Sequence, residues 1–193
     1  RRRGEEGLAE LADPERAVEG AVPAGVASEE EDPGTIRYRT VDWRALRRLG
    51  PSPRLHLETV RGRIELRLLP EEAPLTVDAI VATAVAGRYD DTPFHRVVPN
   101  FVAQGGDVSL GGVREGAGFR LRSEFTRVSY GRGVLGMASA GKDTETTQFF
   151  LTHSPQPHLD GGYTAFGWVE EGLDVLDSLA PEDRVLRAWV SPG

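Results

Sequence analysis

Short apolar runs separated by glycine-rich turns dominate the middle and the end of this chain, and they limit the folds that it can adopt. Runs of this kind favour strands. Strands and helices do not alternate regularly along the sequence, which excludes a doubly wound parallel sheet and favours an antiparallel barrel. The predicted strands cover residues 94–98, 101–104, 134–137, 149–152 and 164–169.

A hairpin is predicted ahead of this region. Residues 55–60 and 64–68 alternate between apolar and polar side chains on either side of Arg61-Gly62, which is the pattern of a half-buried pair of strands. Such a pair needs a barrel or a second sheet to cover its apolar face. A last strand is predicted over residues 184–190.

Two helices are predicted between and after these strands. Over residues 74–87 the apolar residues recur at i, i+3, i+4 and i+7, which indicates an amphipathic helix that ends at a glycine. Pro74 and Thr76 supply its start signals. Residues 172–180 predict a second, shorter helix that ends before Pro181.

The chain divides into three predicted parts. Residues 1–34 are rich in Glu, Ala, Gly and Pro and carry an acidic run, which predicts a flexible acidic leader or linker. Residues 35–52 form a short strand and helix extension, and residues 53–193 form the main domain. The chain begins at Arg1 rather than at a methionine, so we expect a fragment of a longer protein, and any targeting signal would lie in the missing part. We expect a soluble protein, and its compartment, cytoplasmic or periplasmic, stays open.

The extension carries its own helix signal. Asp42 is placed to cap one or two helical turns that end near Gly50. Trp43 and Leu46 are then expected to pack onto the main domain.

Composition excludes several classes of function. The net charge of −7 and the pI near 5.2 argue against a nucleic-acid partner, because binding to phosphates needs a basic face. The absence of cysteine excludes disulfides, thiolate metal sites and cysteine nucleophiles. No apolar run approaches the length of a membrane span. His153, His158 and Asp160 do not have the spacing of a metal site, so no metal is predicted.

Several blocks in one order carry a family resemblance. They are FHRVVPNFVAQGGD at 94–107, GVLGMASAG at 133–141, QFFL at 148–151 and LDG at 159–161. Together they resemble the cyclophilins, peptidyl-prolyl cis/trans isomerases, and more closely the bacterial type. The resemblance covers roughly residues 53–190. It implies a mainly β fold, an eight-stranded, closed antiparallel barrel capped by two helices.

The resemblance also implies a reaction and its catalytic residues. In the twisted state of an X-Pro bond the prolyl nitrogen loses amide conjugation and gains a lone pair, to which an arginine can donate a hydrogen bond. The motif gives this role to Arg96, with Gln104 orienting its guanidinium, and it places Phe101 in the same catalytic group. The reaction needs no cofactor.

The remaining family positions are expected to bind substrate. Val102 and Leu159 join the phenyl rings of Phe101 and Phe150 in a socket for the proline ring. Several positions depart from the common eukaryotic pattern, and His158 does so where tryptophan contributes to cyclosporin binding, which implies weak drug binding. The predicted substrate-binding residues are Val102, Ala138, Ser139, Gln148, Phe150, His158, Leu159 and Tyr163.

The sequence leaves two functions open. The first is a prolyl isomerase that acts on proline-containing peptides and on unfolded or partly folded proteins. The second is a non-catalytic module of the same fold that binds proline-containing segments within a larger multidomain protein. Arg96 and Gln104 favour catalysis, because a module that only binds has no need of the charge.

Overall fold

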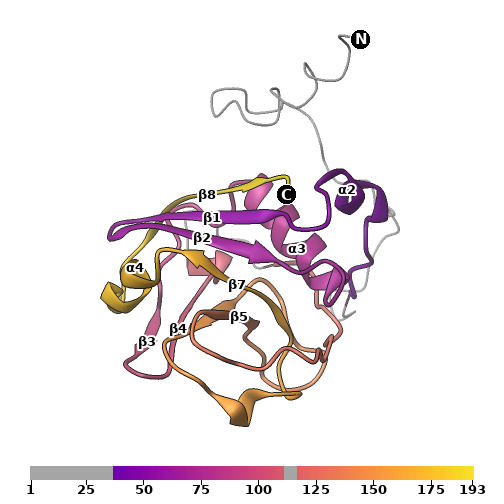
Figure 1. Cartoon of the computed structure of the whole chain (residues 1–193). Helices are drawn as coiled ribbons and strands as arrows, with labels where there is room; N and C mark the ends of the chain where they lie inside the picture. The colour runs from indigo at the N-terminus through magenta and orange to yellow at the C-terminus, as the bar shows by residue number, and fades with distance from the viewer. Residues whose placement is uncertain (1–36, 111–116) are drawn as a thin grey trace. The chain divides into compact units, whose positions relative to one another are not determined.

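The structure is a computed structural model, and it describes residues 37–110 and 117–193 (Figure 1). In these residues eight strands form one curled sheet in the order β3-β4-β6-β5-β7-β2-β1-β8, and every neighbouring pair is antiparallel. The predicted leader, residues 1–34, lies outside the described residues. The strands are β1 (Arg54–Thr59), β2 (Gly62–Leu68), β3 (Arg96–Val98), β4 (Val102–Gly105), β5 (Val134–Met137), β6 (Phe149–Thr152), β7 (Ala165–Glu171) and β8 (Val185–Ser191).

Helices and short turns cover parts of the sheet. Helix α3 packs beside β8, and helix α4 packs beside β2. None of the helices in residues 37–110 and 117–193 is long and apolar enough to cross a bilayer. The helical segments are α2 (Trp43–Arg48), α3 (Pro74–Val85), α4 (Leu173–Ser178) and the 3₁₀ turns η1 (Val108–Leu110) and η2 (Pro157–Leu159).

The sheet is open between β3 and β8, so the prediction of a closed barrel is wrong. Within the described residues these two end strands form no ladder with each other. The segments that precede them meet through an isolated antiparallel bridge between Pro93 and Arg184, and the N–H of Phe94 donates to the carbonyl of Asp183 at 2.7 Å. The bridge is a single pair, and strand β3 begins only at Arg96, three residues after Pro93.

The main core lies on the concave face of the sheet. Successive residues of a strand point to opposite faces, so every second side chain enters the core. Helix α3 and the rings of Phe94 and Phe149 complete it. The fully buried strand residues of this core include Leu55, Leu57, Ile64, Leu66, Leu68, Ala103, Leu135, Met137, Leu151 and Phe166.

Helix α3 begins at Pro74 as predicted, but it is less amphipathic than its pattern indicates. Most of its residues are buried, including Asp78, whose carboxylate accepts hydrogen bonds from the Arg39 guanidinium at 2.9 and 3.0 Å. Val85 belongs to the predicted apolar stripe, yet it is 74% exposed. Helix α3 is therefore buried by the rest of the protein on more sides than the single apolar stripe in its sequence predicts.

The cap of α3 comes from a distant part of the chain. Ala73 at the N-cap position has no capping side chain. The carboxylate of Glu124 accepts hydrogen bonds from the N–H groups of Leu75 at 3.0 Å and Thr76 at 2.8 Å. A carboxylate at this end also interacts favourably with the helix dipole.

The extension packs as predicted in one respect and not in another. Asp42 caps α2 by accepting from the N–H groups of Arg44 and Ala45, both at 3.0 Å. Leu46 is buried in the main core, as expected. Trp43 is 53% exposed, so its predicted packing is wrong, although it lies one turn before Leu46 on the same side of α2.

We predict that Glu124→Ala destabilises the fold by about 1–2 kcal/mol, because two N–H groups at the start of α3 lose their acceptor. Urea denaturation followed by circular dichroism measures this change. Glu124→Gln keeps one carbonyl oxygen and is expected to cost about half as much. Equal stability of the wild type and Glu124→Ala would contradict the capping role.

Candidate functional site

Four residues from four adjacent strands form one transverse row on the convex face of the sheet. Arg96 of β3 pairs with Gln104 of β4, Gln104 with Phe150 of β6, and Phe150 with Gly136 of β5. Residues that lie directly opposite each other share a face of the sheet. The register therefore brings together three of the predicted site residues from strands that are distant in sequence.

A second apolar cluster, separate from the main core, surrounds Phe150. Val102, Leu159 and Phe150 are nearly fully buried in it. The ring of Tyr163 meets the Phe150 ring edge to face, with 5.9 Å between centroids. Phe101 packs against the cluster and is partly exposed. The predicted socket residues thus lie together on the face that carries Arg96.

The Arg96 side chain is exposed and lies over an aromatic ring of this cluster. Its guanidinium carbon is 5.4 Å from the centroid of Phe101. The ring of His158 also stacks on Phe101, with 5.8 Å between centroids. A guanidinium held over an aromatic face keeps its planar donors available at the edge of the cluster.

A chain of side-chain hydrogen bonds continues from the row. The amide nitrogen of Gln104 donates to the amide oxygen of Gln148 at 3.3 Å, and the amide nitrogen of Gln148 donates to Asp107 at 2.9 Å. Asp107 belongs to the sequence motif, but the sequence alone assigned it no role. Its signal was its place directly after the two glycines that follow Gln104.

The predicted backbone-binding residues lie at the border of the cluster. The N–H of Ala138 donates to the carbonyl of Gln148 at 3.0 Å, which joins the end of β5 to the start of β6. Ala138 is partly buried against the cluster, and Ser139, the next residue, is half-buried.

Tyr130 belongs to the site and was not predicted. Its ring stacks on Phe150 with 5.5 Å between centroids, and it is almost completely buried. Its hydroxyl has no hydrogen-bond partner among the described residues, and burial raises the pKa of that hydroxyl. No motif position marks Tyr130, so only the packing reveals it.

Gly136 makes room for these two rings. A Cβ atom at this position would lie 2.5 Å from Cζ of Phe150 and 2.5 Å from the hydroxyl of Tyr130. Any larger residue must therefore displace the rings of the cluster.

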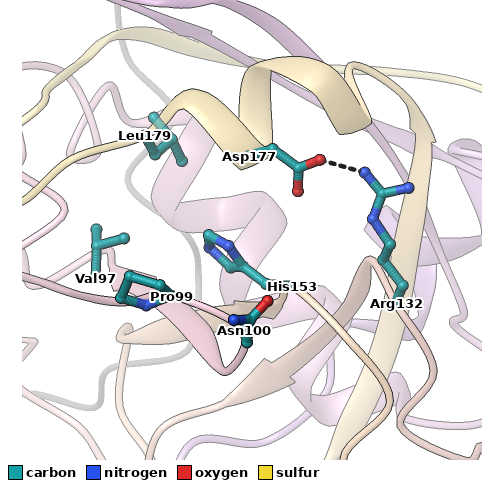
Figure 2. A pocket seen from close by; sticks show the side chains of 7 residues that line it. All are labelled: Val97, Pro99, Asn100, Arg132, His153, Asp177 and Leu179. Carbon is teal, nitrogen blue, oxygen red and sulfur yellow. Dashed lines mark hydrogen bonds and ion pairs between the residues drawn. The ribbon is translucent and has the colours of Figure 1, made fainter.

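A hollow of about 310 Å³ lies on the other side of β3 (Figure 2). Val97 lines it, and as the neighbour of Arg96 in the strand it points to the opposite face. Arg132 donates to Asp177 across the hollow at 2.5 Å, and burial lowers the pKa of the His153 imidazole there. The hollow contains none of the predicted site residues. Its lining residues are Val97, Pro99, Asn100, Arg132, His153, Asp177 and Leu179.

The described side chains form no metal site. In the part of the chain that the structure describes, no group of three or more His, Asp or Glu residues is arranged to hold a metal ion.

Comparison with known proteins gives a consistent result. The family model for "Cyclophilin type peptidyl-prolyl cis-trans isomerase/CLD" matches residues 54–190. A peptidyl-prolyl cis-trans isomerase of Synechococcus elongatus is 43% identical over 136 residues, which cover 69% of this chain and 93% of that protein. Peptidyl-prolyl cis-trans isomerase B of Bacillus subtilis is 43% identical over 124 residues, covering 63% of this chain and 86% of that protein.

Solved structures agree with the sequence matches. The crystal structure of a cyclophilin type peptidyl-prolyl cis-trans isomerase from Cryptosporidium parvum aligns with a TM-score of 0.67 at 26% identity. The alignment covers 74% of this chain and 99% of that chain. The same protein in the presence of the dipeptide Ala-Pro aligns with a TM-score of 0.61 at 26% identity, over 72% and 98% of the two chains.

We predict that Gly136→Ala destabilises the protein by about 1–3 kcal/mol, because the new methyl group overlaps the rings of Phe150 and Tyr130. Thermal denaturation measures the loss, and proton chemical shifts of both rings are expected to move. Gly131→Ala is the matched control, because a Cβ atom there meets nothing within 4 Å. A Gly136→Ala protein as stable as the control would show that the rings are not packed as described.

Proposed function

The chain belongs to the cyclophilin family of peptidyl-prolyl cis-trans isomerases, and we propose that Arg96 performs its catalysis. The protein is an isomerase of X-Pro peptide bonds. The substrates that we propose are exposed X-Pro segments of peptides and of unfolded or partly folded proteins.

The chemical demand on the site is modest. Rotation about the peptide bond has a barrier of about 18–20 kcal/mol, and the uncatalysed X-Pro change takes tens to hundreds of seconds. A turnover of about 10 per second needs roughly a thousandfold gain, or about 4 kcal/mol. One charge-assisted hydrogen bond of about 1.5–3 kcal/mol and a socket shaped for the twisted bond are together sufficient.

Arg96 supplies the hydrogen bond in this proposal. The supporting observation is its place in the row with Gln104 and Phe150, with its guanidinium beside the Phe101 ring. A proline ring held in the apolar cluster places its nitrogen at the edge of that cluster, where the arginine donors lie. The guanidinium then donates to the nitrogen lone pair, which exists only while conjugation is lost, so the bond favours the transition state.

The remaining site residues hold the peptide. Phe101, Val102, Phe150 and Leu159 form the proline socket, with Tyr163 against the Phe150 ring. Main-chain groups at Ala138 and Ser139, together with the side chain of Gln148, bind the peptide backbone on either side of the proline. We assign these roles from the family motif and from the positions of the residues around one cluster.

A non-catalytic module that binds proline segments is the weaker alternative. The relatives named above are isomerases, and this chain keeps the arginine and glutamine that a binding module does not need.

We predict that Arg96→Ala lowers the rate of cis/trans exchange by about 10-fold to 100-fold, because one charge-assisted hydrogen bond to the transition state is lost. Exchange spectroscopy on a small Ala-Pro peptide measures this rate, and titration measures peptide affinity, which is expected to change little. Arg48→Ala, at an exposed arginine in α2, is the control. Equal exchange in Arg96→Ala and the wild type would contradict the catalytic role of Arg96.

We also predict weak binding of cyclosporin, with a dissociation constant above the micromolar range. His158 stands where the family's tryptophan contributes to the drug contact, and its ring is already stacked on Phe101. Isothermal calorimetry measures the affinity, and His158→Trp is expected to tighten it. A micromolar or lower dissociation constant for the wild type would contradict the prediction.

A further inference from the structure

The side-chain hydrogen bonds that join Gln104, Gln148 and Asp107 all donate in the same direction along this chain. The residue at the Asp107 end determines that direction. Gln104 donates to Gln148, and Gln148 donates to Asp107. Each glutamine amide has one side that accepts and one side that donates. Once one amide is oriented, its neighbour must adopt the complementary orientation.

Asp107 is the end that fixes the orientation, because an ionised carboxylate only accepts hydrogen bonds. It therefore holds the amide nitrogen of Gln148 and turns the Gln148 oxygen toward Gln104. Gln104 responds by presenting its nitrogen to Gln148. Its own amide oxygen is left as the acceptor for another donor.

Arg96 is the candidate for that donor. It lies directly opposite Gln104 in the β3–β4 pair, and a guanidinium can only donate. An amide nitrogen turned toward Arg96 would place two donors against each other. With the Gln104 oxygen toward Arg96, a donor faces an acceptor at every step from the Asp107 carboxylate through the two amides to the guanidinium.

Asp107 is itself held in place. Its other carboxylate oxygen accepts from the N–H of Ser109 at 3.0 Å and from the Ser109 hydroxyl at 2.5 Å. Gln148 is held at its backbone, where its carbonyl accepts from the N–H of Ala138. Both ends of the Asp107–Gln148 bond are thus anchored independently of the bond itself.

We propose that Asp107 is a positioning residue for the isomerase reaction, acting through Gln148 and Gln104 to keep the Gln104 oxygen directed at Arg96. The inference rests on the proposed catalytic role of Arg96. It assigns to Asp107 no contact with the substrate. Its contribution is to hold the guanidinium in the orientation that meets the prolyl nitrogen.

Asp107→Asn is the first test, because asparagine has the same shape but can also donate. The amides can then reverse, and we expect the exchange rate on an Ala-Pro peptide to fall about 5-fold, the equivalent of one hydrogen bond. The melting temperature is expected to stay close to that of the wild type. Ser109→Ala removes the hydroxyl that donates to Asp107 but keeps the backbone N–H that also donates to it, and is expected to leave the exchange rate unchanged.

A compensating pair tests the direction itself. When Asp107→Asn is combined with Gln148→Glu, the new carboxylate at position 148 accepts from the amide nitrogen at position 107 and from that of Gln104. The Gln104 oxygen then again faces Arg96. We expect this double variant to recover most of the exchange rate lost in Asp107→Asn alone. A residue that only supports the loop would show no such recovery.

Combining Asp107→Asn with Gln104→Ala tests whether Asp107 acts through Gln104. With Gln104→Ala already present, Asp107→Asn is expected to cause no further loss of exchange, because the relay is already broken. The ¹H–¹⁵N signal of the Arg96 side chain is expected to shift in the same direction in Asp107→Asn and in Gln104→Ala.

The outcomes separate this inference from the proposed function. If Arg96→Ala slows exchange as predicted while Asp107→Asn matches the wild type, the relay is wrong and the role of Arg96 stands. If the Asp107→Asn and Gln104→Ala effects multiply, Asp107 does not act through Gln104 and the inference also fails. If Arg96→Ala has no effect, the proposed function itself fails.

Discussion

The register of β3, β4, β6 and β5 is the constraint on which the site depends. Side chains alternate between the two faces of a strand, so a shift of one residue would move every side chain of that strand to the other face. A slip in β3 would direct Arg96 toward the hollow that Val97 now lines and remove it from Phe101. The buried residues on the concave face oppose such a slip, because it would expose them to water.

The two faces of the sheet formed by β3, β4, β6 and β5 carry different clusters of side chains. The concave face supplies the main core, and the convex face carries the apolar cluster around Phe150 with Arg96 at its border. Strand β6 serves both, since Phe149 and Leu151 enter the core while Phe150 enters the cluster. One short strand therefore contributes both to the main core and to the cluster that we propose holds the proline ring.

Local patterns predicted much of the fold. The hairpin around Arg61-Gly62, the start of α3 at Pro74 and the Asp42 cap all depend on residues within a few positions of each other. Trp43 and the closed barrel were predicted wrongly, because side-chain burial and edge pairing depend on parts of the chain that local patterns do not relate. The motif supplied the names of the site residues, but their placement in one row came from the strand register.

The sequence by itself determined the order of the elements, the family and the residues that the motif carries. The tertiary structure decided the contacts that join distant segments. Glu124 caps α3 from 48 and 49 residues away, and Asp107 meets Gln148 across 41 residues. Tyr130 enters the cluster only because Gly136 leaves space for its ring. Such contacts depend on how the sheet curls and pairs, which no periodicity within a segment encodes.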